Sequence, residues 1–205
     1  LPNTRERSEG FLAGLRSILP DARLVLSLNA GSTAQAACQI THNALAVHPE
    51  INVIFAINDA HAIGAAQACR DEGIAAKDLL LLTFGLEGNT LRDSLVTCEY
   101  CRAGLAMFPE IVGPMCVEAA IVAYEGGALP AHLVTPHAVL TSDSLDQYYH
   151  RVKDGWECNW QAVEAKLSLP LALNASRPGG GHHLPRRLGL IVPFSAHEWY
   201  ANLAQ

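Results

Sequence analysis

The chain has 205 residues, of which 50% are hydrophobic and 17% charged, and its formal net charge is −6. This apolar content is enough for a core, which excludes a mostly disordered chain, and the length favours one domain or one and a half. The negative charge argues against a nucleic-acid surface, which needs clustered lysine and arginine. No apolar run reaches the roughly 18 residues that a membrane span needs.

The predicted elements alternate between helix and strand along most of the chain. Capping-box spacing and helical periodicity predict helices over 3–18 and from Ser32 to about Val47. The nearly continuous apolar run Ile51–Ile57 is typical of a central strand covered on both faces. The other expected strands are Arg23–Leu28, Asp78–Phe84, Leu95–Tyr100 and Leu133–Leu140, and the other expected helices are 60–72, Thr90–Ser94, Gly113–Tyr124 (or from Pro109) and Asp143–His150.

This alternation predicts an α/β fold, a doubly wound parallel sheet with crossover helices on both faces. Binding sites in such sheets lie at the carboxyl ends of the strands. The segments that follow Leu28, Ile57, Phe84 and Tyr100 are therefore the first places to look for functional side chains.

The composition changes after Tyr149. Residues 151–186 hold two tryptophans and three adjacent glycines near prolines, which predict a linker. A strand over Leu188–Val192 and a helix near His197 then begin a new βα unit. Because one such unit cannot bury its own faces, we expect the sequence to be a fragment of a longer protein.

Several short motifs occur in the order, and near the spacing, of a known family. They are Arg5–Phe11, His48–Ile51, Ile54–Asp59 with Ala62–Ala65, Leu82–Phe84, Pro109 with Gly113, and Thr135–Pro136 through Asp146–Tyr149. On these residues the chain resembles the type I periplasmic-binding-protein family. That family includes ribose- and galactose-type sugar-binding proteins and the ligand cores of lactose-repressor-like regulators.

The resemblance implies two α/β lobes with a ligand held in the cleft between them. Residues 1–150 resemble the second lobe with the final crossover, and residues 151–186 form a linker. Residues 187–205 resemble the start of a second copy, so we expect a tandem arrangement.

The resemblance also implies which residues bind the ligand. Arg7 has a fork of donors that suits hydroxyl, carboxylate or phosphate oxygens, and its alternative role is a solvated surface arginine. Asn58 offers one acceptor and two donors after a buried strand, and its alternative role is a helix N-cap. Asp59 is expected to be a cap or a local support. In the second copy, His197 and Trp199 fall at ligand-binding positions, where a ring stacks on sugar C–H groups; the alternative for Trp199 is a core position.

Three positions depart from the sugar-binding pattern of the family. Gly85 stands where relatives commonly have an acidic residue, Ser32 where they have an aromatic ring, and Met107 where they often have a polar amide. Glu87 is the acidic residue that follows nearest to Gly85. These departures favour a ligand less polar than a typical sugar, or a copy that has lost binding.

Catalytic and metal-binding patterns are weak in this sequence. Cys98 and Cys101 form a C-x-x-C with no second pair at zinc spacing, and His182-His183 has no further ligands in sequence reach. No nucleophile, phosphate-loop or metalloprotease motif is present, so we expect no enzyme activity and no cofactor. Free thiols are expected at the six cysteines, which are Cys38, Cys69, Cys98, Cys101, Cys116 and Cys158.

The expected function is a solute-binding module that captures a small molecule, with a sugar as the expected class, for an ABC-type importer or a membrane sensor. The alternative is the ligand-binding core of a lactose-repressor-like transcriptional regulator. Val139–Asp146 resembles the transport-type ending and favours a periplasmic or extracytoplasmic location, whereas free thiols favour the cytoplasm. The compartment therefore stays open. An enzyme on the same fold is the remaining class, because fold does not fix function.

Overall fold

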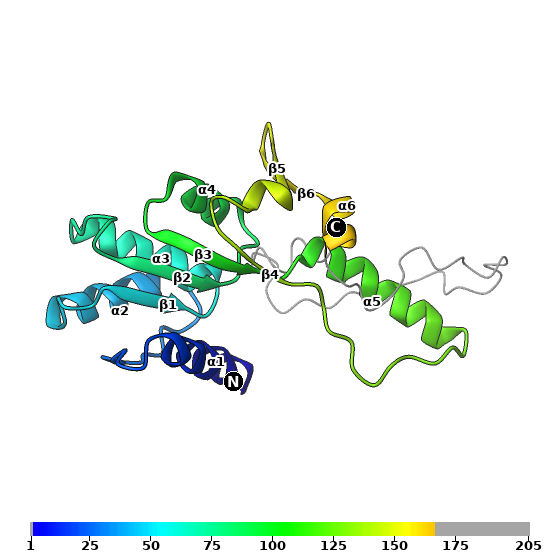
Figure 1. Ribbon diagram of the computed structural model, residues 1–205, viewed down its shortest axis with the longest axis horizontal. Coiled ribbons are helices and arrows are strands. Elements are labelled where there is room, and N and C mark those ends of the chain that lie inside the picture. The colour runs from blue at the N-terminus through cyan, green and yellow to red at the C-terminus, as the bar shows by residue number, and fades with distance from the viewer. Residues whose placement is uncertain (1, 167–205) are drawn as a thin grey trace. The chain divides into compact units, whose positions relative to one another are not determined.

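A computed structural model describes residues 2–166 of the chain (Figure 1). The chain divides into two compact units: the first is Leu1–Ala106 with Val139–Asp146, and the second is Met107–Ala138 with the residues from Gln147 on. The residues of the expected lobe 1–150 are thus shared between both units.

In chain order the described elements are α1 (Pro2–Ile18), α2 (Ala34–Val47), β1 (Val53–Ala56), α3 (Asp59–Asp71), β2 (Leu80–Phe84), α4 (Asn89–Thr97), β3 (Cys101–Ala106), α5 (Pro109–Tyr124), β4 (Ala138–Leu140), the single 3-10 turn η1 (Leu145–Gln147), β5 (Tyr149–Val152), β6 (Gly155–Cys158) and α6 (Trp160–Lys166).

The first unit is built on a sheet in the order β1-β2-β3-β4, in which β1 runs parallel to β2 and β2 parallel to β3. α3 packs on β1 and β2, and α2 packs on α3. Gly64 allows this close helix packing, because a Cβ there would lie 2.2 Å from the carbonyl oxygen of Ala34.

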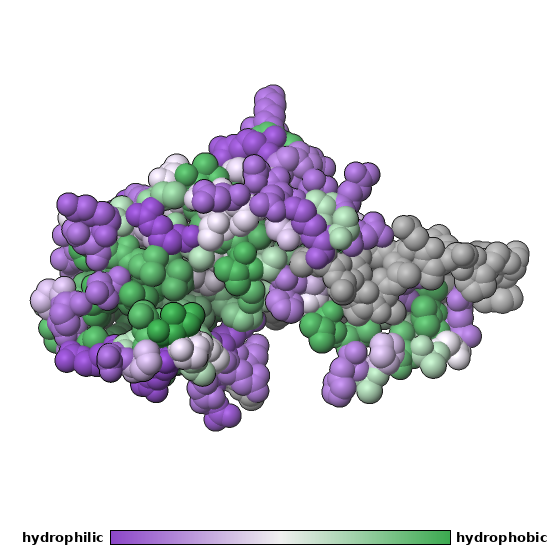
Figure 2. Space-filling view, viewed as in Figure 1, coloured by the Kyte–Doolittle hydropathy of each residue, from purple (hydrophilic) through white to green (hydrophobic). Residues whose placement is uncertain are grey.

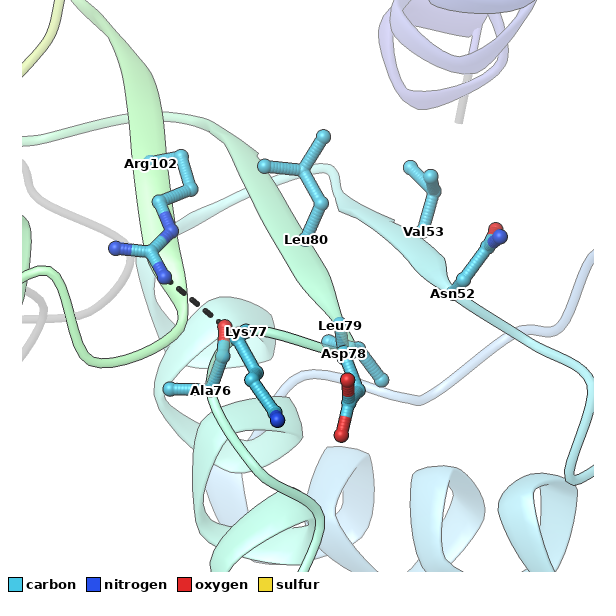
Figure 3. Close-up of a pocket in the computed structure, with 8 residues that line it drawn as sticks. All are labelled: Asn52, Val53, Ala76, Lys77, Asp78, Leu79, Leu80 and Arg102. Atoms are coloured by element: carbon cyan, nitrogen blue, oxygen red, sulfur yellow. Dashed lines mark hydrogen bonds between the residues drawn. The ribbon is translucent and has the colours of Figure 1, made fainter.

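α1 covers the opposite face of the same sheet. Its Phe11 ring stacks on Phe55 of β1 with ring centroids 4.1 Å apart. Val53, which shares the face of Phe55 because side chains alternate along a strand, points away from α2 and α3 (Figure 3). Helices therefore lie on both faces of a parallel sheet, which confirms the predicted doubly wound α/β fold.

The start of α2 corrects one predicted cap. The N-cap is Thr33 rather than Ser32, and the Thr33 Oγ1 accepts a hydrogen bond from the Ala36 amide at 3.1 Å. We expect Thr33→Ala to lower the free energy of unfolding by about 1 kcal/mol, because the first turn loses its side-chain acceptor. The exposed neighbour is the matched control, since Ser32→Ala is expected to change stability by less than about 0.5 kcal/mol. Urea unfolding measures both variants, and equal losses would contradict the assignment.

The strand expected at Arg23–Leu28 is wrong, because the structure gives this segment no regular secondary structure. β1 forms one edge of the sheet, and no described strand pairs with this segment. A strand needs a neighbour to satisfy its backbone N–H and C=O groups. Leu24 and Leu28 remain 50% and 54% exposed, so the apolar content of the segment is not buried by pairing.

The strand expected at Leu95–Tyr100 is also wrong. α4 extends into this segment as far as Thr97, because Leu91 and Leu95, one helical turn apart, are both buried on one face of the helix. The helix ends where Cys98 takes a left-handed conformation with a φ of 51°. The next strand, β3, begins only at Cys101.

Two later elements are shorter in the structure than the sequence predicts. The expected strand Leu133–Leu140 is reduced to β4, which begins after Pro136, a residue without an N–H group for a strand ladder. The expected helix Asp143–His150 is reduced to the turn η1, because the backbone from Tyr149 onward pairs with β6 instead.

The second unit contains α5. This helix begins at Pro109, which was the alternative to the predicted start at Gly113. The first half of the helix is buried at Ile111 and Met115, whereas Val117 and Tyr124 in the second half are 49% and 58% exposed. Apolar side chains gather along α5 in the space-filling view (Figure 2).

The segment after Tyr149 begins with folded elements, where a linker over 151–186 was expected. β5 and β6 pair antiparallel, with Val152 opposite Gly155 across a two-residue turn, and α6 follows. The Tyr149 ring is buried and stacks on Phe108 with centroids 5.8 Å apart. The rest of the expected linker and the expected unit at 187–205 lie outside the described residues.

Candidate ligand-binding site

Arg7 on α1 lies beside the carboxyl ends of β1 and β2. Its Nη1 donates to the carbonyl oxygen of Ile57, just after β1, at 2.9 Å. The guanidinium carbon lies 4.1 Å from the centre of the Phe84 ring at the end of β2. Partial burial lowers the pKa of Arg7 from its usual value, and the Glu87 charge opposes that shift. The guanidinium is held at this edge, and within residues 2–166 its other N–H groups have no hydrogen-bond partner.

Asn58 follows β1 and is the N-cap of α3. Its Oδ1 accepts a hydrogen bond from the His61 amide at 2.9 Å. The side-chain NH2 group has no partner among the described residues, so it remains available to an acceptor. The predicted alternatives are therefore compatible, because one atom caps the helix while the other end of the same amide offers two donors.

The loop after β2 rests on two buried carboxyl groups. Asp59 and Glu87 are only 4% and 3% exposed. The Asp59 Oδ2 accepts hydrogen bonds from the amides of Glu87 at 3.0 Å and Gly88 at 3.1 Å. Asp59 is thus the local support that the sequence predicted. Burial and the nearby Asp59 charge raise the pKa of Glu87.

The backbone of Gly85 explains why no acidic side chain stands there. Gly85 has a φ of 126°, which L side chains rarely adopt. A Cβ at this position would lie 2.1 Å from the Asp59 Oδ1 and 2.8 Å from the Glu87 Oε2. The two carboxyl groups therefore take the space that a side chain at residue 85 needs.

The structure brings Arg7 and Asn58 together beside the carboxyl ends of the strands, which we call the carboxyl edge of the sheet. Arg7 donates a hydrogen bond to Ile57, and Asn58 directly follows Ile57 in the sequence. Met107 lies two residues before α5. His197 and Trp199 lie outside the described residues and stay predictions. Sequence reasoning missed the position of Phe84 under Arg7, for which an aromatic residue at the end of a buried strand was the available signal.

A small open pocket of about 300 Å³ lies at the other end of the sheet (Figure 3). Its lining includes Val53 and Leu80 at the amino ends of β1 and β2, and Lys77 and Asp78 before β2. Arg102 in this pocket is tied down by two carbonyl oxygens, those of Cys98 and Ala76. This guanidinium therefore braces two loops, whereas Arg7 retains donors for a ligand.

Cysteine, histidine and carboxylate side chains are the remaining candidates for chemistry in residues 2–166. No group of three or more histidine, cysteine, aspartate or glutamate side chains is arranged there to hold a metal ion. All six cysteines are free thiols, as expected, and burial raises the pKa of Cys69 to about 11 and that of Cys101 to about 12. Such thiols are poor nucleophiles at neutral pH. Among the helices of the described part, none combines the length and apolar content of a membrane span.

Comparison with known proteins agrees with this fold. Residues 2–84 match the family described as periplasmic binding proteins and sugar binding domain of LacI family. The ribose import binding protein RbsB of Bacillus subtilis is 33% identical over 121 residues, which cover 57% of this chain and 36% of that protein. An ABC transporter periplasmic solute binding protein from Actinobacillus succinogenes, solved with bound D-allose, matches with a TM-score of 0.61 and 25% identity over 68% of this chain and 49% of that one.

These matches show a likeness to type I periplasmic binding proteins over part of the chain. This confirms the resemblance predicted from the motifs in residues 1–150. A myo-inositol binding protein from Caulobacter shares the fold, with a TM-score of 0.62 and 22% identity over 69% of this chain and 48% of that one. The chain spans about half, or less, of the length of these relatives.

Proposed function

We propose that this chain is part of a solute-binding module that holds a sugar at the carboxyl edge of the β1-β2 sheet. The observation that carries the proposal is the anchored guanidinium of Arg7, which is fixed by Ile57 and Phe84 while other N–H groups remain available. Relatives of the chain are a ribose import binding protein and a solute binding protein with bound D-allose, which supports a sugar as the ligand class. Their names also support an ABC-type importer as the partner.

The chemistry of the two side chains fits sugar hydroxyl groups. A hydroxyl oxygen accepts from the guanidinium fork of Arg7, and a second accepts from the NH2 group of Asn58. Both donors stand on a rigid support, because Arg7 is held by two contacts and Asn58 is fixed as a helix cap. Little side-chain freedom is then lost on binding, which favours affinity.

A thermal-shift screen of the full-length protein against D-ribose, D-allose and myo-inositol tests the proposal. A ligand that binds only the folded state raises the melting temperature. We expect at least one of these polyols to do so at millimolar concentration. No shift with any of them, nor with a wider panel of monosaccharides, would overturn the sugar assignment.

Asn58→Ser separates ligand binding from helix capping. Serine retains a capping oxygen, so stability is expected to change by a few tenths of a kcal/mol only. The donors to the ligand are lost, so sugar affinity is expected to fall by roughly 1–3 kcal/mol. Calorimetry and urea unfolding of the same variant measure the two effects. Unchanged affinity would remove Asn58 from the site.

A regulator core is the second candidate, because the matching family description includes the sugar binding domain of LacI family. A regulator binds DNA and changes its affinity for DNA when the sugar binds. Sugar-sensitive retention of a genomic DNA fragment by the full-length protein would favour this candidate over transport.

A further inference from the structure

The two buried carboxyl groups beneath the loop 85–88 form an unusual support for the candidate site. All four residues of this loop are buried. Three successive backbone amides point at the pair: Leu86 N–H donates to the Glu87 Oε2 at 3.0 Å, and the next two amides donate to the Asp59 Oδ2. The loop is therefore attached to the start of α3 through carboxyl oxygens.

The two carboxyl groups also lie close together, because a Cβ on Gly85 would be 2.1 Å from the Asp59 Oδ1 and 2.8 Å from the Glu87 Oε2. A direct hydrogen bond between them would need a proton on one of them, because two carboxylates have no donor. Two ionised carboxylates so close together in a buried site repel each other strongly. This closeness in a buried site favours one ionised group and one protonated group.

The charged and titratable groups around the pair come from three further elements. Arg7 on α1 and Arg92 on α4 are the cations that interact with Glu87, and Cys101 on β3 interacts with Asp59. The Arg92 Nε also donates to the carbonyl oxygen of Leu86 at 2.9 Å. Both cations favour a negative charge on the pair, which agrees with one carboxylate but does not supply the proton that the second group needs.

We propose that Asp59 and Glu87 share a single proton, and that this shared proton positions the loop 85–88 and, through it, Arg7. Both residues that hold the Arg7 guanidinium lie close in sequence to the carboxyl pair or the loop. Ile57, whose carbonyl oxygen holds the guanidinium, stands two residues before Asp59, and Phe84, on whose ring the guanidinium rests, stands directly before the loop. Asp59 and Glu87 are positioning residues. The part of the proposal that concerns Arg7 rests on the proposed function.

The stability of the loop depends on pH because only the singly protonated carboxyl pair holds the loop. Burial and the Asp59 charge raise the pKa of Glu87, so the folded chain keeps a proton that the unfolded chain has lost. The folded state then binds more protons, and the stability contributed by the pair falls as pH rises from the ordinary glutamate pKa toward the raised one. Once the proton leaves, repulsion between the carboxylates loosens the loop.

Hydrogen exchange measured by NMR on the 205-residue chain tests the shared proton without any ligand. The readout is the protection of the Leu86, Glu87 and Gly88 amides relative to amides within β2, at pH 6 and at pH 9. We expect wild-type relative protection to fall by about tenfold or more, since one proton is linked to loop release. In Glu87→Gln the amide donates to Asp59 at every pH, so relative protection is expected to change less than about twofold.

The control variant is Glu99→Gln, which removes a half-exposed carboxylate paired with Arg70 and is expected to behave like wild type. A pH-independent wild type, or an equal fall in Glu87→Gln, overturns the proposal. If Glu87→Gln does not fold, a carboxyl 13C titration of the wild-type chain decides: a glutamate midpoint well above the ordinary value for Glu87 supports the proposal, and an ordinary midpoint overturns it.

A second readout separates this proposal from the proposed function. In the full-length protein, affinity for the sugar found in the thermal-shift screen is expected to fall between pH 6 and pH 9 in wild type but not in Glu87→Gln. Sugar binding with the same pH profile in both proteins overturns the link to Arg7. If no sugar binds, the proposed function fails, while the exchange experiment still decides on the shared proton.

Discussion

Replacing Arg7 with alanine is expected to weaken sugar binding by the full-length protein by roughly 1–3 kcal/mol, which is about fivefold to more than a hundredfold in Kd. The loss has two sources. Ligand oxygens lose charge-assisted donors, and the Phe84 ring loses the guanidinium that covers it. Isothermal titration calorimetry measures the change.

Two further variants make this result specific. Arg5→Ala removes an exposed arginine from the same helix, where it pairs with Glu9, and is expected to bind sugar like wild type. Arg7→Lys retains the charge but loses the planar fork, so its affinity is expected to lie between that of wild type and that of Arg7→Ala. Equal affinities in wild type and Arg7→Ala would remove Arg7 from the site.

Gly85→Ala is expected to lower the free energy of unfolding by roughly 3 kcal/mol or more, through backbone strain and overpacking together. The new Cβ would meet the Asp59 Oδ1 at 2.1 Å, at a φ of 126° that alanine rarely adopts. Because Asp59 is fixed by bonds to two loop amides, it cannot move away without releasing the loop. Urea unfolding followed by circular dichroism measures the loss.

Gly73→Ala is the matched control for this effect. Gly73 has a φ of 66°, and a Cβ there would meet nothing within 4 Å. Its substitution therefore has only the left-handed backbone cost, roughly 1–2 kcal/mol. If Gly85→Ala loses no more stability than Gly73→Ala, the carboxyl pair does not fill the space at Gly85.

The central part of the fold could be predicted from the sequence because local pattern and tertiary partners agree there. The runs Ile51–Ile57 and Asp78–Phe84 contain β1 and β2, and the polar residues after Ile57 begin α3 as expected. Arg23–Leu28 has a similar apolar content but forms no strand. The difference lies in the neighbouring strand, which a local pattern does not reveal.

The candidate site was predicted in part. Motif resemblance pointed to Arg7 and Asn58, and the structure places both beside the carboxyl ends of β1 and β2, while their role in binding stays a prediction. The Asp59–Glu87 pair was missed because 28 residues separate them and only the pairing of β1 with β2 brings them together. A glutamate between buried leucine and glycine residues was the signal available in the sequence.

The most direct test of the account is an NMR titration of the full-length protein with the sugar found in the thermal-shift screen. The account predicts that the side-chain signals of Arg7 Nε–H and the Asn58 NH2 group shift on binding. The same signals of Arg102 and Asn52, which line the pocket at the opposite end of the sheet, are predicted to stay in place. Shifts at Arg102 and Asn52 without shifts at Arg7 and Asn58 would contradict the placement of the ligand at the carboxyl edge.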